Sequence, residues 1–147
     1  MRSVIRITIA APLERVFGLA ADVERWPERL PHYRYVRRLR GRGGERRYAM
    51  GARRGRIPVS WKAVQRPLPE RGEIEFEHVG GFTTGMQVRW RLRPTREAVD
   101  VSIEHRLELR WPLVGELIAD RIIGRQFVEP IAGRTLRRIK LLAEAAP

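Results

Sequence analysis

The order of the sequence patterns predicts an α+β fold, with a curved antiparallel sheet of about six to seven strands wrapped round one long C-terminal helix. Apolar and polar residues alternate with a period of two through most of residues 3–109. The period becomes helical over Leu113–Glu144, the one segment long enough to cover a sheet face. No repeat or linker interrupts the chain, so we expect one domain over residues 1–147.

The first thirty residues predict one strand followed by two short helices. In Ser3–Ile9 the isoleucines occupy alternate positions, which indicates a strand with one apolar face. Pro12 suits the first turn of a helix, and a second short helix is expected near Glu24–Leu30, where Pro27 and Pro31 break up the segment. We expect these two helices to close one end of the sheet.

The middle of the chain predicts six further strands, separated by turns that contain Gly or Pro. The expected strands are Arg34–Leu39, Arg46–Ala52, Ile57–Gln65, Glu73–Val79, Met86–Leu92 and Val99–Leu109. The last three alternate between apolar and charged residues, which is typical of an antiparallel sheet with one buried face and one wet face. Their outward rows are acidic, basic and acidic in turn, so we expect ion pairs across these strands.

The C-terminal segment carries a broad apolar stripe at helical spacing. Pro130 lies inside this segment and is expected to kink the helix, because proline lacks the N–H group of the helical hydrogen bond. The small residues Gly124, Ala132 and Gly133 leave room where the helix faces the sheet. A sheet and a helix arranged in this way can enclose an apolar pocket.

The composition excludes several classes of site. Without cysteine, the chain has no disulfide, no thiol nucleophile and no Cys-ligated metal. The three histidines lack metal-like spacing, and no nucleotide-binding glycine motif or GxSxG motif is present, so we expect no metal and no cofactor. No stretch is apolar for long enough to cross a bilayer, and charged residues interrupt the N-terminal apolar run, so we expect a cytoplasmic protein.

The formal net charge is +13, and of the 30 basic residues only Lys62 and Lys140 are lysine. The window from Arg34 to Arg56 contains ten arginines and a single acid, Glu45. A coding bias toward arginine or an adaptation to heat explains this excess without any function. The functional interpretations are an acidic protein partner, an anionic membrane or nucleic acid. Nucleic acid is the least favoured, because the sequence shows no known binding module and no interleaved aromatic platform.

Three motifs near the N-terminus resemble a known superfamily: Ala11–Phe17, Asp22–Pro27 and Tyr33 with the strand after it. Weaker agreement lies in Trp61, in Gly80–Phe82 before the Trp90 strand, and in Trp111–Leu113 before the helix. The chain resembles the START-like superfamily, also called SRPBCC, and within it the bacterial polyketide cyclase/dehydrase proteins of the aromatase/cyclase and coenzyme Q-binding-like kinds. The resemblance covers nearly the whole chain and implies the helix-grip fold. It is much less specific for function, since the superfamily includes enzymes, lipid carriers and ligand sensors.

The resemblance also implies two positions that act on a poly-β-ketone chain in the aromatase/cyclase branch. One is a tyrosine after the Trp-Pro turn, which Tyr33 matches. The other is an arginine four residues past a strand tryptophan, but the residue four past Trp61 is Gln65. Arg66 is one step further along and belongs to the opposite strand face. The expected catalytic candidates are Tyr33 and Gln65 together with His78, which lies at a strand end near Gly80-Gly81, where a pocket mouth is expected.

The inward face of the expected sheet combines apolar, aromatic and a few polar side chains. The expected pocket residues are Tyr35, Met50, Trp61, Phe76, Phe82, Met86, Trp90 and His105. Each of these alone suits plain core packing, but together they indicate the lining of a small-molecule site. The same alternative holds for His78 and His105, which act on a ligand or are buried histidines bonded to backbone or water.

Two functions follow as expectations. The first is binding of a hydrophobic, polyketide-like or other polycyclic or lipidic small molecule between sheet and helix, with cyclisation or dehydration left open. The second is a non-catalytic lipid or quinone carrier that docks on an anionic membrane. An acidic acyl carrier protein is the expected partner in the first case. The basic docking patch that would serve either partner consists of Arg37, Arg38, Arg46, Arg47, Arg53 and Arg54.

Overall fold

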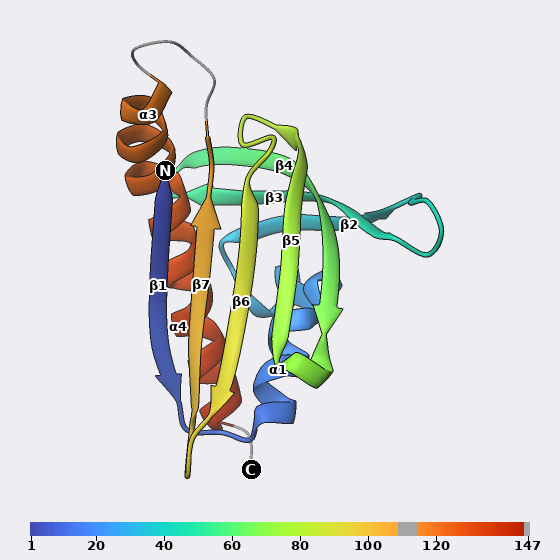
Figure 1. Ribbon diagram of the computed structural model, residues 1–147, viewed down its shortest axis with the longest axis vertical. Helices are drawn as coiled ribbons and strands as arrows, with labels where there is room; N and C mark the ends of the chain where they lie inside the picture. Colours follow the sequence, from blue (N-terminus) through green and yellow to red (C-terminus); the bar gives the residue numbers. More distant parts are fainter. Residues whose placement is uncertain (109–114, 146–147) are drawn as a thin grey trace.

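A curved antiparallel sheet wraps round a long C-terminal helix in the computed structural model of the protein (Figure 1), which describes residues 1–108 and 115–145. The seven strands are β1 (Arg2–Ile9), β2 (Tyr33–Leu39), β3 (Arg46–Arg54), β4 (Ile57–Leu68), β5 (Glu73–Gly81), β6 (Gln87–Pro94) and β7 (Val99–Arg106). The α+β prediction and the strand number are confirmed. The expected features at Leu109 and at Trp111–Leu113 lie outside the described residues.

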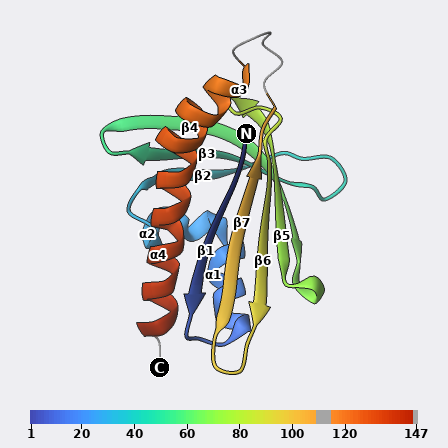
Figure 2. The same ribbon diagram turned by 60° about the vertical axis from the view of Figure 1, so that its left-hand side comes forward.

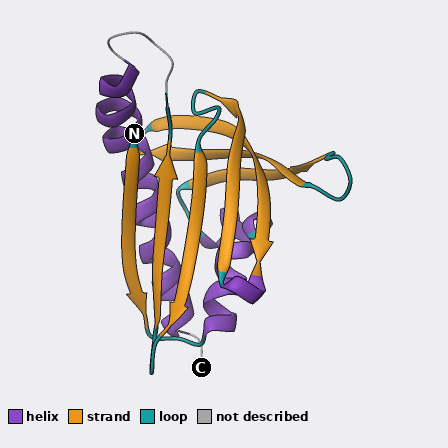
Figure 3. Cartoon of the chain, in the orientation of Figure 1, coloured by secondary structure: helices purple, strands orange, loops and turns teal. Residues whose placement is uncertain are grey.

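All strands are antiparallel and follow the order β1-β7-β6-β5-β4-β3-β2. Consecutive strands from β2 to β7 are therefore neighbours, whereas β1 pairs with β7, the last strand. Between β1 and β2 lie α1 (Leu13–Ala21), the 3-10 turn η1 (Val23–Arg25) and α2 (Trp26–Arg29). These are the short helices expected from the sequence, and Figure 3 shows all helices on one side of the sheet.

The C-terminal helix is continuous but not uniform. It comprises α3 (Gly115–Ile118), a π-helical segment η3 (Ala119–Val128) and α4 (Glu129–Ala145). Pro130 is the second residue of α4 and has no N–H for the carbonyl of Gln126, four residues earlier. Arg54 supplies the donor instead, with its Nε 2.9 Å from the Gln126 carbonyl oxygen. The disturbance expected at the proline thus coincides with a π-helix and a bond to the β3–β4 hairpin.

The helix lies beside β1 along the length of the sheet (Figure 2). Leu136 and Ile139 of α4 are almost completely buried, as are Ile9 of β1 and Ile103 of β7. Burial of these side chains supplies the apolar contact between sheet and helix. No described helix is both long and apolar enough to span a membrane.

The outward face of β5, β6 and β7 carries the expected ladder of ion pairs. Arg93 contacts Glu73 at 2.9 Å, and Arg89 contacts Glu75 at 2.8 Å. On the other side of β6, the Arg91 guanidinium lies 3.6 Å from Glu104 of β7. The outward charged rows that the alternating pattern predicts are therefore neighbours in the structure.

Candidate ligand cavity

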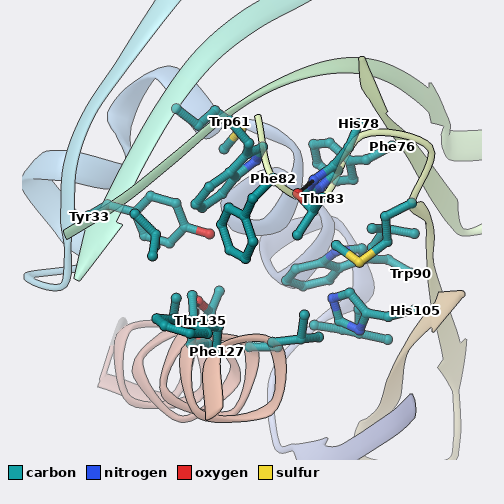
Figure 4. A pocket seen from close by; sticks show the side chains of 18 of the residues that line it. Tyr33, Trp61, Phe76, His78, Phe82, Thr83, Trp90, His105, Phe127 and Thr135 are labelled. Atoms are coloured by element: carbon teal, nitrogen blue, oxygen red, sulfur yellow. Dashed lines mark hydrogen bonds between the residues drawn. The ribbon is translucent and has the colours of Figure 1, made fainter. Parts of the chain in front are cut away.

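A cavity of about 90 Å³ lies between the inner face of the sheet and the C-terminal helix (Figure 4). Six strand residues expected in the pocket line it: Met50, Trp61, Phe76, His78, Trp90 and His105. Tyr33, Phe82 and Met86, also expected there, line it from the start of β2 and from the β5–β6 turn. Val88, which shares the inward face of β6 with Trp90, lines it as well, and further side chains complete the wall: Trp26, Val59, Thr83, Ile103, Phe127, Val128, Ile131, Ala132 and Thr135.

An aromatic cluster centred on Trp26 lines part of the cavity. The Trp26 ring lies 4.9 Å from Tyr33, 6.0 Å from Trp90 and 6.5 Å from Phe76, measured between ring centroids. Its Nε1–H donates to the carbonyl of Leu19 at 3.0 Å, so the one polar atom of the indole is satisfied. The Trp-Pro turn that marks the family resemblance therefore also builds the wall of the site.

Tyr35 lies outside the cavity, contrary to the expectation. The register of β2 against β3 shifts between Tyr33, opposite Ala52, and Tyr35, opposite Gly51. This bulge turns Tyr33 inward and leaves Tyr35 on the outer face, where its ring covers Gly51. The Arg37 guanidinium stacks on that ring at 4.7 Å from the centroid. A bulge of one residue is invisible to strict alternation, which explains the error.

Gln65 is buried but does not line the cavity. Its Nε2 donates to the Ala21 carbonyl at 2.9 Å and so ties β4 to the end of α1. Its Oε1 has no partner among the described residues. Arg66 faces outward and lies 4.0 Å from Glu75, as strand alternation predicts. Neither Gln65, at the position of the expected arginine, nor Arg66, one step further along, therefore reaches the cavity.

His78 sits in an apolar, aromatic setting at the end of β5. Its ring stacks on Trp61 at 5.6 Å with the two planes nearly parallel, and its Nδ1 lies 2.7 Å from the hydroxyl oxygen of Thr83. Burial, and to a smaller extent the neighbouring His105, lowers the pKa of His78 from 6.5 to about 3. At neutral pH the ring is uncharged.

His105 lines the cavity from β7 and is likewise neutral. Burial lowers its pKa to about 4. Its Nδ1 is buried and has no hydrogen-bond partner among the described residues. An unpartnered polar atom on a residue that lines a cavity is a candidate for a hydrogen bond with a ligand.

Tyr33 and Thr135 form a second polar group on the opposite wall. Burial raises the pKa of the Tyr33 hydroxyl well above its usual value, which a hydrogen bond with Thr135 offsets only in part. The Thr135 hydroxyl donates to the Ile131 carbonyl at 2.8 Å, and its oxygen lies 2.8 Å from Nε2 of His32. Thr135 is a polar residue on the apolar stripe of the helix, and this interruption is the signal that would have identified it.

The polar groups of the cavity are all uncharged at neutral pH. No Asp, Glu, Lys or Arg is among the described residues that line it. Within the same described part of the chain, no three His, Asp or Glu side chains gather in a way that could hold a metal ion. The arrangement suits an apolar ligand with a few carbonyl or hydroxyl groups.

The arginines of the expected basic docking patch divide between the two faces of the sheet. Arg37, Arg47 and Arg53 belong to the outer face, with Arg47 contacting Glu45 at 3.4 Å. By strand parity Arg38, Arg46 and Arg54 belong to the inner side, where Arg38 contacts Glu24 at 3.7 Å and Arg54 binds the helix. These six arginines therefore do not form one continuous surface, because neighbours along a strand point in opposite directions.

Comparison with known proteins identifies the family of the chain. The sequence model of the family described as "Polyketide cyclase / dehydrase and lipid transport" matches residues 9–127. The granaticin polyketide synthase bifunctional cyclase/dehydratase of Streptomyces violaceoruber is 31% identical over 108 residues, 71% of this chain and 33% of that relative. The chain thus spans about a third of the length of this curated relative.

Solved structures share the fold at low sequence identity. The Zhui aromatase/cyclase from Streptomyces sp. R1128 superimposes with a TM-score of 0.77 at 19% identity, covering 98% of this chain and 93% of that chain. The di-domain aromatase/cyclase StfQ of the steffimycin pathway gives 0.80 at 20% identity, with 97% of this chain against 50% of that one. A START superfamily protein from Mycobacterium smegmatis gives 0.73 at 16% identity, covering 96% and 98%. Together they show the START-like, helix-grip fold.

Proposed function

Because this chain belongs to the polyketide cyclase/dehydrase and lipid transport family, we propose that its cavity binds an uncharged, polyketide-like small molecule. The observation that carries the proposal is the cavity itself: aromatic walls with a few neutral polar groups, at His78, His105 and Tyr33. An aromatic or polycyclic ligand would stack against Trp61 and Trp90. Its carbonyl or hydroxyl groups would meet the unpartnered Nδ1 of His105 and the Tyr33 hydroxyl.

The size of the cavity sets a condition on binding. Sites for drug-sized ligands usually have volumes of about 300–1,000 Å³, whereas this cavity has about 90 Å³. Phe82 is the half-exposed side chain over the cavity, and its ring contacts Phe127 of the helix at 5.7 Å. Phe82 lies in the β5–β6 turn between Gly81 and Gly85, both with φ of 95°. We infer that this turn moves outward when a ligand enters.

Proton transfer is the finer part of the proposal. In an aldol cyclisation a base removes the proton between two carbonyl groups, a carbon–carbon bond forms, and the acceptor carbonyl oxygen takes up a proton. Tyr33 remains protonated at neutral pH and is suited to donate to that oxygen. A histidine whose pKa is about 3 is a weak base, so His78 is better suited to hydrogen bonding than to proton abstraction. The geometry therefore supports ligand binding more strongly than turnover.

A non-catalytic lipid or quinone carrier is the second candidate function. The weak basicity of both cavity histidines favours it, as does the place of Gln65 outside the cavity. Native mass spectrometry of the purified protein separates the two, because it gives the mass of any ligand that co-purifies. An aromatic polyketide supports the first function, and a quinone or phospholipid contradicts it.

Replacing Tyr33 tests the catalytic step. Tyr33→Phe keeps the ring that contacts Trp26 and removes only the hydroxyl. If Tyr33 donates the proton, turnover of a cyclisable poly-β-ketone should fall by roughly 10²-fold or more, whereas ligand affinity should fall by only about tenfold or less, the effect of one neutral hydrogen bond. Tyr35→Phe, outside the cavity, is the matched control. Equal turnover of Tyr33→Phe and the unsubstituted protein would rule out this role.

A further inference from the structure

An open hollow of about 310 Å³ lies beside the turn between β3 and β4. Its lining consists of Arg34, Arg53, Gly55, Arg56 and Pro58. The three arginines are exposed, and no carboxylate is among the described residues that line the hollow. The ligand cavity shares none of these residues, so the hollow is a separate feature of the molecule.

The hollow and the cavity lie on opposite faces of the same strands. Ala52 of β3 pairs with Tyr33 on one side and with Val59 on the other, and both of these partners line the cavity. The next pair along the hairpin, Arg53 with Pro58, lines the hollow. Because successive residues of a strand point to opposite faces, a ligand in the hollow would not occupy the cavity.

The arginines of the hollow carry charge that the protein does not neutralise. None of Arg34, Arg53 and Arg56 forms an ion pair with a described residue. Arg54, in the same hairpin, does not add to them, because its Nε binds the Gln126 carbonyl of the helix. Three like charges in one hollow repel one another, and a multiply charged anion would relieve this repulsion.

Tyr35, which lies outside the cavity, orients one of these arginines. Cζ of Arg34 lies over the Tyr35 ring at 5.6 Å from its centroid, and Cζ of Arg37 lies over the same ring at 4.7 Å. The ring covers Gly51, where a side chain would collide with it. A guanidinium that contacts a ring through its face keeps its N–H donors free, because they lie in its plane. The contact therefore reduces the entropy that Arg34 would lose on binding an anion.

We propose that this hollow binds the terminal phosphate or diphosphate group of a small molecule. The forked guanidinium of arginine matches the geometry of phosphate and makes two parallel hydrogen bonds with it. Three such groups favour a multiply charged anion, and a terminal phosphate carries about −1.5 to −2 charge at pH 7. A phosphodiester, as in most phospholipid headgroups and in nucleic acids, carries a single charge and has fewer free oxygens.

The inference goes beyond the proposed function. The two sites share no residue, so phosphate binding in the hollow can be present or absent whatever the cavity binds. The two proposals therefore fail independently.

Calorimetric titration with inorganic diphosphate tests the inference. In a chloride buffer of constant low ionic strength, diphosphate should bind saturably at one site per chain. Dimethyl phosphate, a singly charged diester, should bind about tenfold more weakly or less tightly still, because it offers fewer charged contacts. Equal affinity for the diester, or no saturable binding of diphosphate, would overturn the inference.

Substitution of single arginines separates a defined site from general attraction. Arg34→Gln and Arg53→Gln should each weaken diphosphate binding about tenfold, because each removes a charged donor. Arg96→Gln is the matched control, since Arg96 is exposed on the turn between β6 and β7, at the end of the molecule that holds the C-terminus (Figure 1). Equal losses from all three would mean that the net charge of +13 attracts the anion without a defined site, and would contradict the proposal.

The aromatic contact can be tested without a change of net charge. Tyr35→Leu should weaken diphosphate binding by roughly two- to fivefold, the contribution of one exposed cation–π contact. Tyr35→Phe keeps the ring and should bind nearly as tightly as the unsubstituted protein. Equal affinity of Tyr35→Leu and the unsubstituted protein would contradict a site that Tyr35 orients.

Backbone amide signals in an NMR spectrum locate the bound anion. Gly55 lines the hollow with φ of 62°, and Gly72, in the turn between β4 and β5, has φ of 63° and serves as the matched control. On addition of diphosphate the Gly55 signal should move and the Gly72 signal should stay in place. Movement of both signals, or of neither, would contradict binding in the hollow.

Discussion

Polar residues are charged on the outer face of strands β5, β6 and β7 and neutral on the inner face. On the outer face, carboxylates and arginines stay charged and pair across strands, as Glu75 does with Arg89 at 2.8 Å. On the inner face the polar residues are His78 and His105, which burial holds in the neutral form. Alternating residues of the same strands thus occupy two dielectric environments.

The two faces therefore contribute differently to the stability of the sheet and to the cavity. The outer pairs are solvated and each contributes little to folding. The inner face supplies most of the burial, and its few polar groups lower stability unless they find partners. Buried polar atoms without a partner, such as Nδ1 of His105, therefore indicate a ligand site and not a structural contact.

The largest contrast should appear between neighbours on β6. Trp90 is buried against Trp26, whereas Arg89 next to it is exposed. Trp90→Ala should lower the free energy of unfolding by about 3–5 kcal/mol, since it removes a large buried side chain and leaves a cavity. Arg89→Ala should cost about 0.5 kcal/mol.

Urea denaturation at neutral pH measures both changes. If Trp90→Ala does not fold, Trp90→Phe keeps part of the packing and should lose an intermediate amount. Similar losses for Trp90→Ala and Arg89→Ala would break the contrast between the faces.

Acid should destabilise the inner face before the outer one. All three histidines, His32, His78 and His105, have folded pKa values of about 3 to 4, below the unfolded value of 6.5. Between these values the unfolded chain binds protons that the folded chain does not. The stability that the neutral histidines contribute to the folded protein is therefore complete above pH 6.5 and is lost as the pH falls toward 4. The free energy of unfolding should fall by up to about 2 kcal/mol per histidine between pH 7 and 5.

The outer carboxylates respond in a lower pH window. Burial raises the pKa of Glu104. The hydrogen bond from Arg2 and the nearby arginine charges lower that pKa by more than burial raises it, so the net shift is downward from 4.5. The stability that Glu104 contributes is present above pH 4.5 and is lost below it.

Urea denaturation at pH 7 and 5 should show the loss of stability that the histidines cause. The free energy of unfolding of His105→Gln should fall less between these two pH values than that of the unsubstituted protein. Equal stability of the unsubstituted protein at both would contradict neutral histidines in the folded state.

The smallest effect ranks two carboxylates of the outer face. The Glu104 side chain is 9% exposed and contacts Arg2, Arg106 and Arg91 at 2.7, 3.4 and 3.6 Å. Glu104→Gln should cost about 1–2 kcal/mol, because it leaves three arginines without their shared partner. Glu75→Gln, at a more exposed pair, should cost about 0.5 kcal/mol in the same urea titration. The reverse order would show that burial does not decide the strength of these pairs.

Much of the fold could be predicted because its signals are local. Alternation located seven strands and their inward and outward faces, and the change of period located the C-terminal helix. The ion pair between Arg93 and Glu73 followed from the same pattern once consecutive strands were paired. For the site, alternation also placed His78 and His105 on the inner face, while their ligand roles stay predictions.

The departures from the expected site have different physical reasons. The bulge between Tyr33 and Tyr35 reverses the face of the second tyrosine. The expected basic patch treated neighbouring arginines as one surface, although strand alternation divides them. The π-helical segment η3 was not predicted, because the apolar spacing of the C-terminal segment indicated only a helix with a kink at Pro130.

The sequence by itself determined the order of elements, the two faces of the sheet and the family, because periodicity and short motifs are properties of neighbouring residues. Only the tertiary structure decided that Gln65 binds the end of α1 instead of lining the cavity. It also decided that Thr135 contacts both the Tyr33 hydroxyl and the His32 ring. It decided as well that Phe82 of the β5–β6 turn contacts Phe127 and that Arg54 binds the Gln126 carbonyl of the C-terminal helix. These relations join residues far apart in the chain, and their distances depend on how the sheet bends round the helix.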